Sequence, residues 1–84
     1  MEIIRTDDFL KDFRGLPKAA QRFLSQQERR FIRNRFDPRL HIKKLKELAG
    51  AYSFRVTRRY RVLFLFRGGK VVFFAVGHRK DVYR

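Results

Sequence analysis

The spacing of apolar side chains changes once along the chain, from a helical repeat in the first half to alternation in the second. The opening stretch MEIIRT predicts a short first strand. Thr6 follows it, and its hydroxyl is suited to capping a helix. Asp7 and Asp8 then fall in the first turn of that helix, near the positive end of its dipole. The pattern therefore predicts a strand followed directly by a capped helix.

A second helix is predicted over about Lys18 to Arg35, because Gly15 and Pro17 interrupt the first one and proline is favoured at a helix start. Asp37-Pro38 should end it, since the residue before a proline is pushed out of the helical region. The expected buried stripe lies at intervals of three and four residues and comprises Ala20, Phe23, Leu24, Gln27 and Phe31. The two helices should pack as a hairpin.

The lysine-rich stretch RLHIKKLKELAG follows as a connector that ends at Gly50. We expect four apolar side chains to anchor it to the core: Leu40, Ile42, Leu45 and Leu48.

From Tyr52 onward the period is two, and the segments YSFRVT and YRVLFLFR read as neighbouring strands. Gly68-Gly69 is typical of a tight hairpin, after which Val71 to Val76 returns as a third strand. The first strand of the chain can join the edge of this meander. The predicted fold is therefore α+β, a single domain over residues 1–84 in which an N-terminal strand and a two-helix hairpin pack on a four-stranded, mainly antiparallel sheet.

The loop between the first two strands of the meander decides which arginines can act together. A three-residue loop, Thr57 to Arg59, places Arg55 directly opposite Arg61 on one face of the sheet. A two-residue loop, Arg58-Arg59, places them on opposite faces. Glycine is usual at the last position of a three-residue loop and is missing here, so both arrangements stay open.

Composition adds a strong electrostatic signal, because 22 lysines and arginines against 8 acidic residues give a net charge of +14. Such a field attracts nucleic acid or an acidic protein. Arginine is about twice as common as lysine, which favours forked binding of phosphates. The absence of cysteine excludes disulfides and thiolate metal sites and fits a reducing cytoplasm. No apolar run reaches the roughly 18 residues of a membrane span, and the start of the sequence does not resemble a signal peptide.

The last predicted strand passes through Gly77 into the string HRKDVYR. His78 has an unperturbed pKa of about 6.5, which suits proton transfer near neutral pH. Arginine holds phosphate well but is a poor base, because it stays protonated. The string is either one wall of an RNA-cutting site or a solvated basic tail.

Two stretches of the chain, KLKELAGAYSFRVTRRYRVLFLF and VGHRKDVY, resemble toxins of the RelE/ParE superfamily from type II toxin–antitoxin pairs. The terminal string favours the RelE-like branch. That resemblance implies an mRNA interferase, an endoribonuclease that enters the ribosomal decoding site, cuts the messenger there without metal or other cofactor, and so inhibits translation.

The resemblance also implies roles for individual residues. Arg61 matches an arginine that holds the scissile phosphate, Arg79 the arginine of the terminal motif, and Tyr83 a tyrosine that stacks on or orients a base. Arg55 matches one of two alternating basic residues, and the other position holds Ser53, where several relatives have a lysine that they need for cleavage. The predicted catalytic set is Arg55, Arg61, His78, Arg79 and Tyr83, the predicted RNA-binding set is Lys43, Lys44, Lys46, Arg58, Arg59 and Lys80, and His41 is held in reserve.

Two rival functions remain compatible with this sequence. One is a ParE-like inhibitor of DNA gyrase without nuclease activity, and the other is a weakened toxin that acts mainly in binding its antitoxin and operator DNA. The expected partners are an acidic cognate antitoxin, mRNA in the ribosomal decoding site, rRNA phosphates, and operator DNA only through the antitoxin complex, with no membrane involved.

Overall fold

The computed structural model describes residues 2–83, so Met1 of the predicted first strand and Arg84 of the terminal string lie outside the described residues. The elements in chain order are β1 (Ile3–Arg5), α1 (Asp7–Arg14), α2 (Lys18–Arg33), the 3-10 turn η1 (Pro38–Leu40), β2 (Lys43–Lys44), β3 (Ala51–Arg55), β4 (Tyr60–Arg67) and β5 (Lys70–His78). They form one sheet of order β1-β5-β4-β3-β2, in which β1 is parallel to β5 and the other pairs are antiparallel.

This architecture confirms the predicted α+β fold, with one difference in the strand count. The sheet has five strands instead of four, because Lys43 and Lys44 of the predicted connector pair with Ser53 and Tyr52 of β3. Two residues with polar side chains give no periodic signal, so the sequence pattern did not reveal this strand.

The two helices begin and end close to the predicted positions. The Thr6 hydroxyl accepts a hydrogen bond from the Phe9 amide at 3.1 Å, as the cap prediction required. Helix α2 ends at Arg33, two residues before the predicted end, because Asn34 is already extended. Its buried residues are Ala20, Leu24, Gln27 and Phe31. Phe23 was wrongly included in that stripe, since it is 50% exposed.

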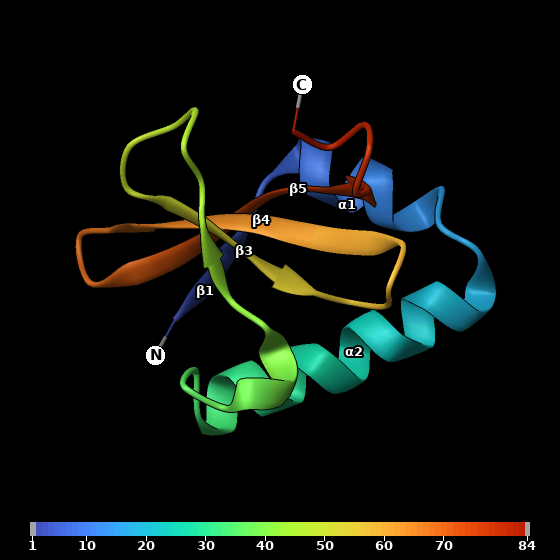
Figure 1. Ribbon diagram of the computed structural model, residues 1–84, viewed down its shortest axis with the longest axis horizontal. Coiled ribbons are helices and arrows are strands. Elements are labelled where there is room, and N and C mark those ends of the chain that lie inside the picture. Colours follow the sequence, from blue (N-terminus) through green and yellow to red (C-terminus); the bar gives the residue numbers. More distant parts are fainter. Residues whose placement is uncertain (1, 84) are drawn as a thin grey trace.

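Helix α2 covers one face of the sheet, α1 lies beside β5, and the main core lies between these helices and the sheet. Figure 1 shows α2 along one side of the sheet, while the loop after β2 and the C-terminal segment lie on the other side. Phe31 of α2 is fully buried, and its ring lies 5.1–5.8 Å from the rings of Phe54, Phe64 and Phe73. These aromatic contacts fix the sheet against the helix.

The opposite face has a smaller cluster, in which Leu45, Ala51 and Leu63 are buried and the C-terminal segment packs against them. The connector prediction holds for Leu40 and Leu45, which are both buried. It is wrong for Ile42 and Leu48, which are 37% and 47% exposed. The connector thus reaches the core through two of its four apolar side chains, since β2 holds its backbone at the sheet edge.

The β3–β4 connection has the longer of the two loops considered. The amide of Val56 donates to the carbonyl of Tyr60 at 2.9 Å, and Arg55 pairs directly with Arg61. The hydroxyl of Thr57 accepts hydrogen bonds from the amides of Arg59 and Tyr60, which supports the turn although it lacks glycine. The two arginines therefore share the sheet face opposite the helices.

Gln27 ties α2 to the end of β3. Its side-chain amide donates to the carbonyls of Arg39 and Arg55 at 3.0 and 2.8 Å, and its oxygen accepts from Arg30 at 2.7 Å. A buried amide satisfied in this way is directional, so it fixes the backbone to which it bonds. The strand end that positions Arg55 is thereby held to the helix.

Candidate functional site

A cationic pocket of about 320 Å³ lies on the sheet face opposite the helices. Its lining comes from β2, β3, the β3–β4 loop, β4 and the segment after β5. Seven residues line it, none of them acidic: Lys43, Arg55, Arg58, Arg61, Arg79, Lys80 and Tyr83. Six cations around one small hollow repel one another, and an anion bound there relieves that repulsion. This cationic pocket is the strongest candidate for a functional site.

Arg61 forms the floor of the cationic pocket and is only 6% exposed. Its Nε donates to the Ser53 hydroxyl at 2.9 Å, and its Nη2 donates to the carbonyl of His41. His41 adopts a left-handed conformation with φ 47° at the end of η1. The guanidinium is thus fixed from two sides by groups far apart in sequence.

Burial lowers the pKa of Arg61 from its usual value, and the charge of Arg55 acts in the same direction. The neighbouring Tyr83 hydroxyl opposes this lowering of the Arg61 pKa. Arginine nevertheless remains charged at neutral pH. The consequence is a partly desolvated cation that an incoming anion stabilises more strongly than it would stabilise an arginine in open solvent.

Ser53 connects Arg61 to Tyr83. Its side chain is fully buried, and its oxygen lies 3.2 Å from the Tyr83 hydroxyl while it accepts from Arg61 Nε. By the resemblance noted above, this serine stands where several relatives have a lysine. In the structure it is buried behind the cationic pocket and links two of the residues that line it, Arg61 and Tyr83. The residue types alone gave no signal for this role.

Lys43 lies directly opposite Ser53 on the neighbouring strand β2 and lines the cationic pocket. Paired residues of adjacent strands point to the same face. A cation therefore lies beside Ser53, the position at which several relatives have a lysine. The only sequence signal for it was the lysine-rich connector, because the strand that orients Lys43 was not predicted.

The segment after β5 returns across the sheet face. The amides of Asp81 and Val82 donate to the carbonyl of His78 at 2.8 and 2.9 Å, and the amide of Arg79 donates to the carbonyl of Arg59 at 2.7 Å. These bonds turn the chain so that Arg79, Lys80 and Tyr83 all line the cationic pocket.

Four predicted site residues lie outside the cationic pocket: His78, Lys44, Lys46 and Arg59. His78 pairs with Tyr60, and the two rings meet edge to face at 5.8 Å on the helix-covered side. Its Nδ1 accepts from the Lys80 amide at 3.2 Å. Lys44 pairs with Tyr52 and so belongs to the same side as His78, whereas Lys46 and Arg59 are exposed in loops. The structure therefore does not bring His78 together with the arginines.

Metal-binding clusters and membrane-spanning helices are both absent from the part of the chain from Glu2 to Tyr83. No group of three or more His, Asp or Glu side chains there could hold a metal ion. No helix of this part is both long and apolar enough to cross a membrane.

A model of the family described as the ParE toxin of type II toxin–antitoxin systems matches residues 3–83. The chain belongs to this family. The protein is accordingly a toxin of a type II toxin–antitoxin system. No curated protein sequence matches the toxin.

Solved structures of related toxins have the same fold. The toxin is similar to a chain of the RelB–RelE antitoxin–toxin complex from Methanococcus jannaschii, with 23% identity, a TM-score of 0.78 and coverage of 95% of this chain and 94% of that one. The YoeB/ParE toxin from Agrobacterium tumefaciens is 18% identical, with a TM-score of 0.76 and coverage of 94% and 99%. A chain of the intact RelBE complex from E. coli is 17% identical, with a TM-score of 0.71 and coverage of 92% and 94%. These likenesses confirm the RelE-like fold predicted from the sequence.

Proposed function

We propose that the toxin is a ribosome-dependent, metal-independent endoribonuclease that cuts messenger RNA in the decoding site, and that the cationic pocket is where it cuts. The observation that carries the proposal is the convergence of six cations and Tyr83 from distant parts of the chain on one hollow of about 320 Å³. A phosphodiester carries a negative charge, and its charge increases at the transition state of cleavage.

The chemistry requires three contributions. The RNA 2′-hydroxyl must lose a proton and attack the adjacent phosphorus in line, and the departing 5′-oxygen must gain a proton. Arg55 and Arg61, which lie opposite each other, would hold the scissile phosphate and stabilise its growing charge. Arg79 would add charge from the other wall, and Tyr83 would stack on or orient a base. Fixed geometry lowers the barrier because the attack no longer depends on random orientation.

His78 drops out of this mechanism, because its ring contacts Tyr60 on the helix-covered side. Within the cationic pocket, dissociable protons are carried by Lys43, Lys80 and Tyr83. We therefore assign the proton transfers to these groups and the charge stabilisation to the arginines.

The first experiment induces the toxin in cells and maps messenger 5′ ends by primer extension, with and without translation blocked at initiation. New ends in frame with codons are expected, and they should disappear when translation is blocked. Arg79→Ala should lower their yield by at least about tenfold, because an exposed cation of the cationic pocket is lost while the fold is not. New ends that persist under the block would contradict ribosome dependence.

A matched pair of substitutions tests the cationic pocket itself. Lys43→Ala should lower cleavage by about tenfold or more, because Lys43 lines the pocket opposite Ser53. Lys44→Ala removes the same charge one residue away on the other face of the sheet and should leave cleavage nearly unchanged. Equal effects of the two changes, measured by the same primer extension, would mean that only net charge matters.

A second candidate function is inhibition of DNA gyrase through a protein–protein contact, and the match to a ParE toxin model favours it. Growth arrest without new messenger ends, together with loss of supercoiling activity when purified gyrase meets the toxin, would select this function. The same basic surface would then hold a protein target.

A further inference from the structure

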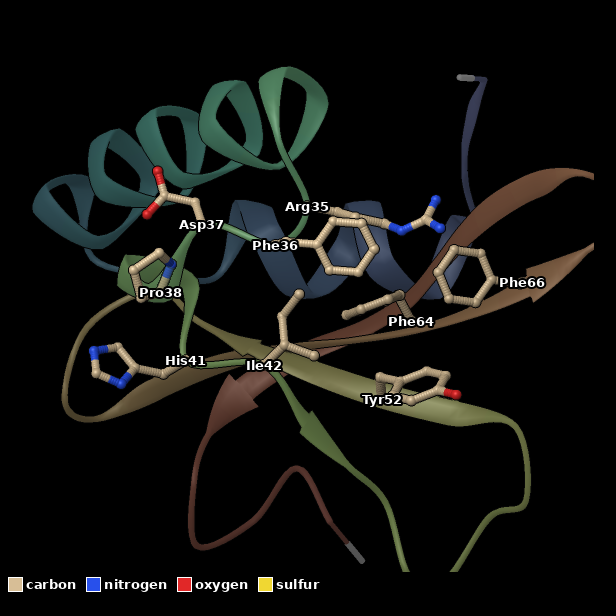
Figure 2. Close-up of a pocket in the computed structure, with 9 residues that line it drawn as sticks. All are labelled: Arg35, Phe36, Asp37, Pro38, His41, Ile42, Tyr52, Phe64 and Phe66. Atoms are coloured by element: carbon tan, nitrogen blue, oxygen red, sulfur yellow. The ribbon is translucent and has the colours of Figure 1, made fainter.

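An apolar groove of about 530 Å³ lies apart from the cationic pocket and shares no lining residue with it. Its walls come from the segment after α2, from the connector and from the strands β3 and β4. Figure 2 shows the rings of Phe36, Phe66 and Tyr52 and the side chain of Ile42 around one space, with Pro38 and His41 at the far end. Nine residues line the groove: Arg35, Phe36, Asp37, Pro38, His41, Ile42, Tyr52, Phe64 and Phe66.

The rim of this apolar groove exposes large apolar side chains to water. Phe36 is 78% exposed, Phe66 45% and Ile42 37%. Single exposed apolar residues are common, but several around one hollow mark a surface that binds something. The apolar lining favours binding of an apolar side chain in the groove.

The charge at the rim is positive. The guanidinium carbon of Arg35 lies 4.9 Å from the centre of the Phe36 ring and 5.3 Å from that of Phe66. Within residues 2–83, ion pairs link Arg5 to Glu28, Arg39 to Asp37 and Lys70 to Glu2, and none of the three involves Arg35. The hydrogen bond from Arg39 lowers the pKa of Asp37 to about 2, so the carboxylate that lines the groove is already engaged. An incoming carboxylate can therefore pair with Arg35.

We propose that the apolar groove docks an acidic segment of the antitoxin, which places a bulky apolar side chain against Phe36, Ile42 and Tyr52 and pairs a carboxylate with Arg35. Membership of a toxin–antitoxin family supplies the partner, and complementarity to a net charge of +14 supplies its acidic character. A second copy of the toxin would be repelled, and a phosphate backbone would leave the apolar lining unfilled. The inference does not depend on whether the toxin cuts RNA.

The apolar groove is also physically joined to the cationic pocket. His41 and Ile42 line the groove, Lys43 lines the pocket, and the His41 carbonyl accepts from Arg61. An antitoxin segment in the groove therefore contacts the stretch of chain that fixes Arg61. Such a contact lets the antitoxin act on the pocket without covering it.

The test uses the antitoxin encoded in the same operon, purified as a complex with the toxin. Phe36→Ala should speed dissociation of the complex by about tenfold or more, because a central aromatic anchor is lost. Phe23→Ala is the matched control, since it removes an exposed phenylalanine on α2 that does not line the groove. Because Phe36 is 78% exposed, its loss should leave thermal unfolding unchanged.

Charge reversal provides the second arm. Arg35→Glu should speed dissociation by about tenfold, while Arg29→Glu, an equal change of net charge on an exposed residue of α2, should have a much smaller effect. Equal dissociation rates for the Phe36 and Phe23 variants would overturn the proposal. So would a Phe36 variant that keeps antitoxin binding but loses self-association or RNA binding, because the groove would then belong to a second copy or to nucleic acid.

Discussion

Replacing Arg61 with alanine is expected to lower messenger cleavage by about 100- to 1,000-fold, the loss seen when one preorganised donor to a charged transition state is removed. Arg61 is fixed by Ser53 and by the carbonyl of His41 at the floor of the cationic pocket. A donor that needs no reorganisation during the reaction contributes more than a mobile surface cation. Primer extension on messenger from induced cells measures the loss.

Arg61→Lys separates charge from geometry. Lysine keeps the positive charge but cannot donate to Ser53 and His41 at once through a planar fork. The lysine variant should therefore retain less than about a tenth of the cleavage of the unsubstituted toxin. Both variants leave buried acceptors without their donor, at a cost of about 1–3 kcal/mol each. Urea denaturation must therefore show that the variants stay folded at the assay temperature. A folded alanine variant that cuts like the parent would remove Arg61 from the mechanism.

Periodicity was sufficient to predict most of the fold. Alternation identified β3 and β4, and the pair Gly68-Gly69 marked the hairpin that leads into the apolar run of β5, where both glycines have positive φ. The register that joins Arg55 to Arg61 followed from one of the two loop lengths that the sequence left open. Strand β2 could not be predicted, because a two-residue edge strand is defined by its partner and has no period of its own.

A β-bulge in β5 explains why His78, the one predicted catalytic residue outside the cationic pocket, lies on the other face of the sheet. Strict alternation from Phe73 would have placed His78 on the same face as Arg61. The register of β4 against β5 shifts between Leu63 and Phe64, which inserts Phe74 as an extra residue. Beyond the bulge every side chain changes face, so Val76 and His78 lie on the helix-covered side. No single-sequence pattern reports a bulge inside an apolar run.

The role of Ser53 depends on hydrogen bonds between segments far apart in the sequence, which residue types alone do not reveal. Ser53 stands where several relatives have a lysine, but Lys43 lies opposite it and supplies a positive charge there. The Ser53 hydroxyl also connects Arg61 to Tyr83. The residue types that line the cationic pocket could be named from the sequence, because arginine and lysine are the side chains suited to binding phosphate. Their mutual support could not be predicted, because it depends on the pairing of β2 with β3.

The helix-covered core also sets the position of the cationic pocket, and Phe31→Ala is expected to destabilise the toxin by about 3–5 kcal/mol. Phe31 is fully buried and contacts the rings of Phe54, Phe64 and Phe73, which lie on three different strands. Its removal leaves a cavity under the strands that carry Arg55 and Arg61 on their other face. Urea denaturation followed by circular dichroism measures the loss.

The exposed phenylalanine Phe36 provides the control for this prediction. Phe36→Ala makes the same chemical change at a side chain that is 78% exposed and should alter stability by less than about 0.5 kcal/mol. A stability of 5–15 kcal/mol is typical of small domains, so the loss at Phe31 would leave a large unfolded fraction in a toxin at the lower end of that range. Cleavage and antitoxin binding should then fall together, whereas Arg61→Ala should reduce cleavage alone. Phe31→Ala with unchanged stability would mean that the ring cluster does not hold the sheet in place.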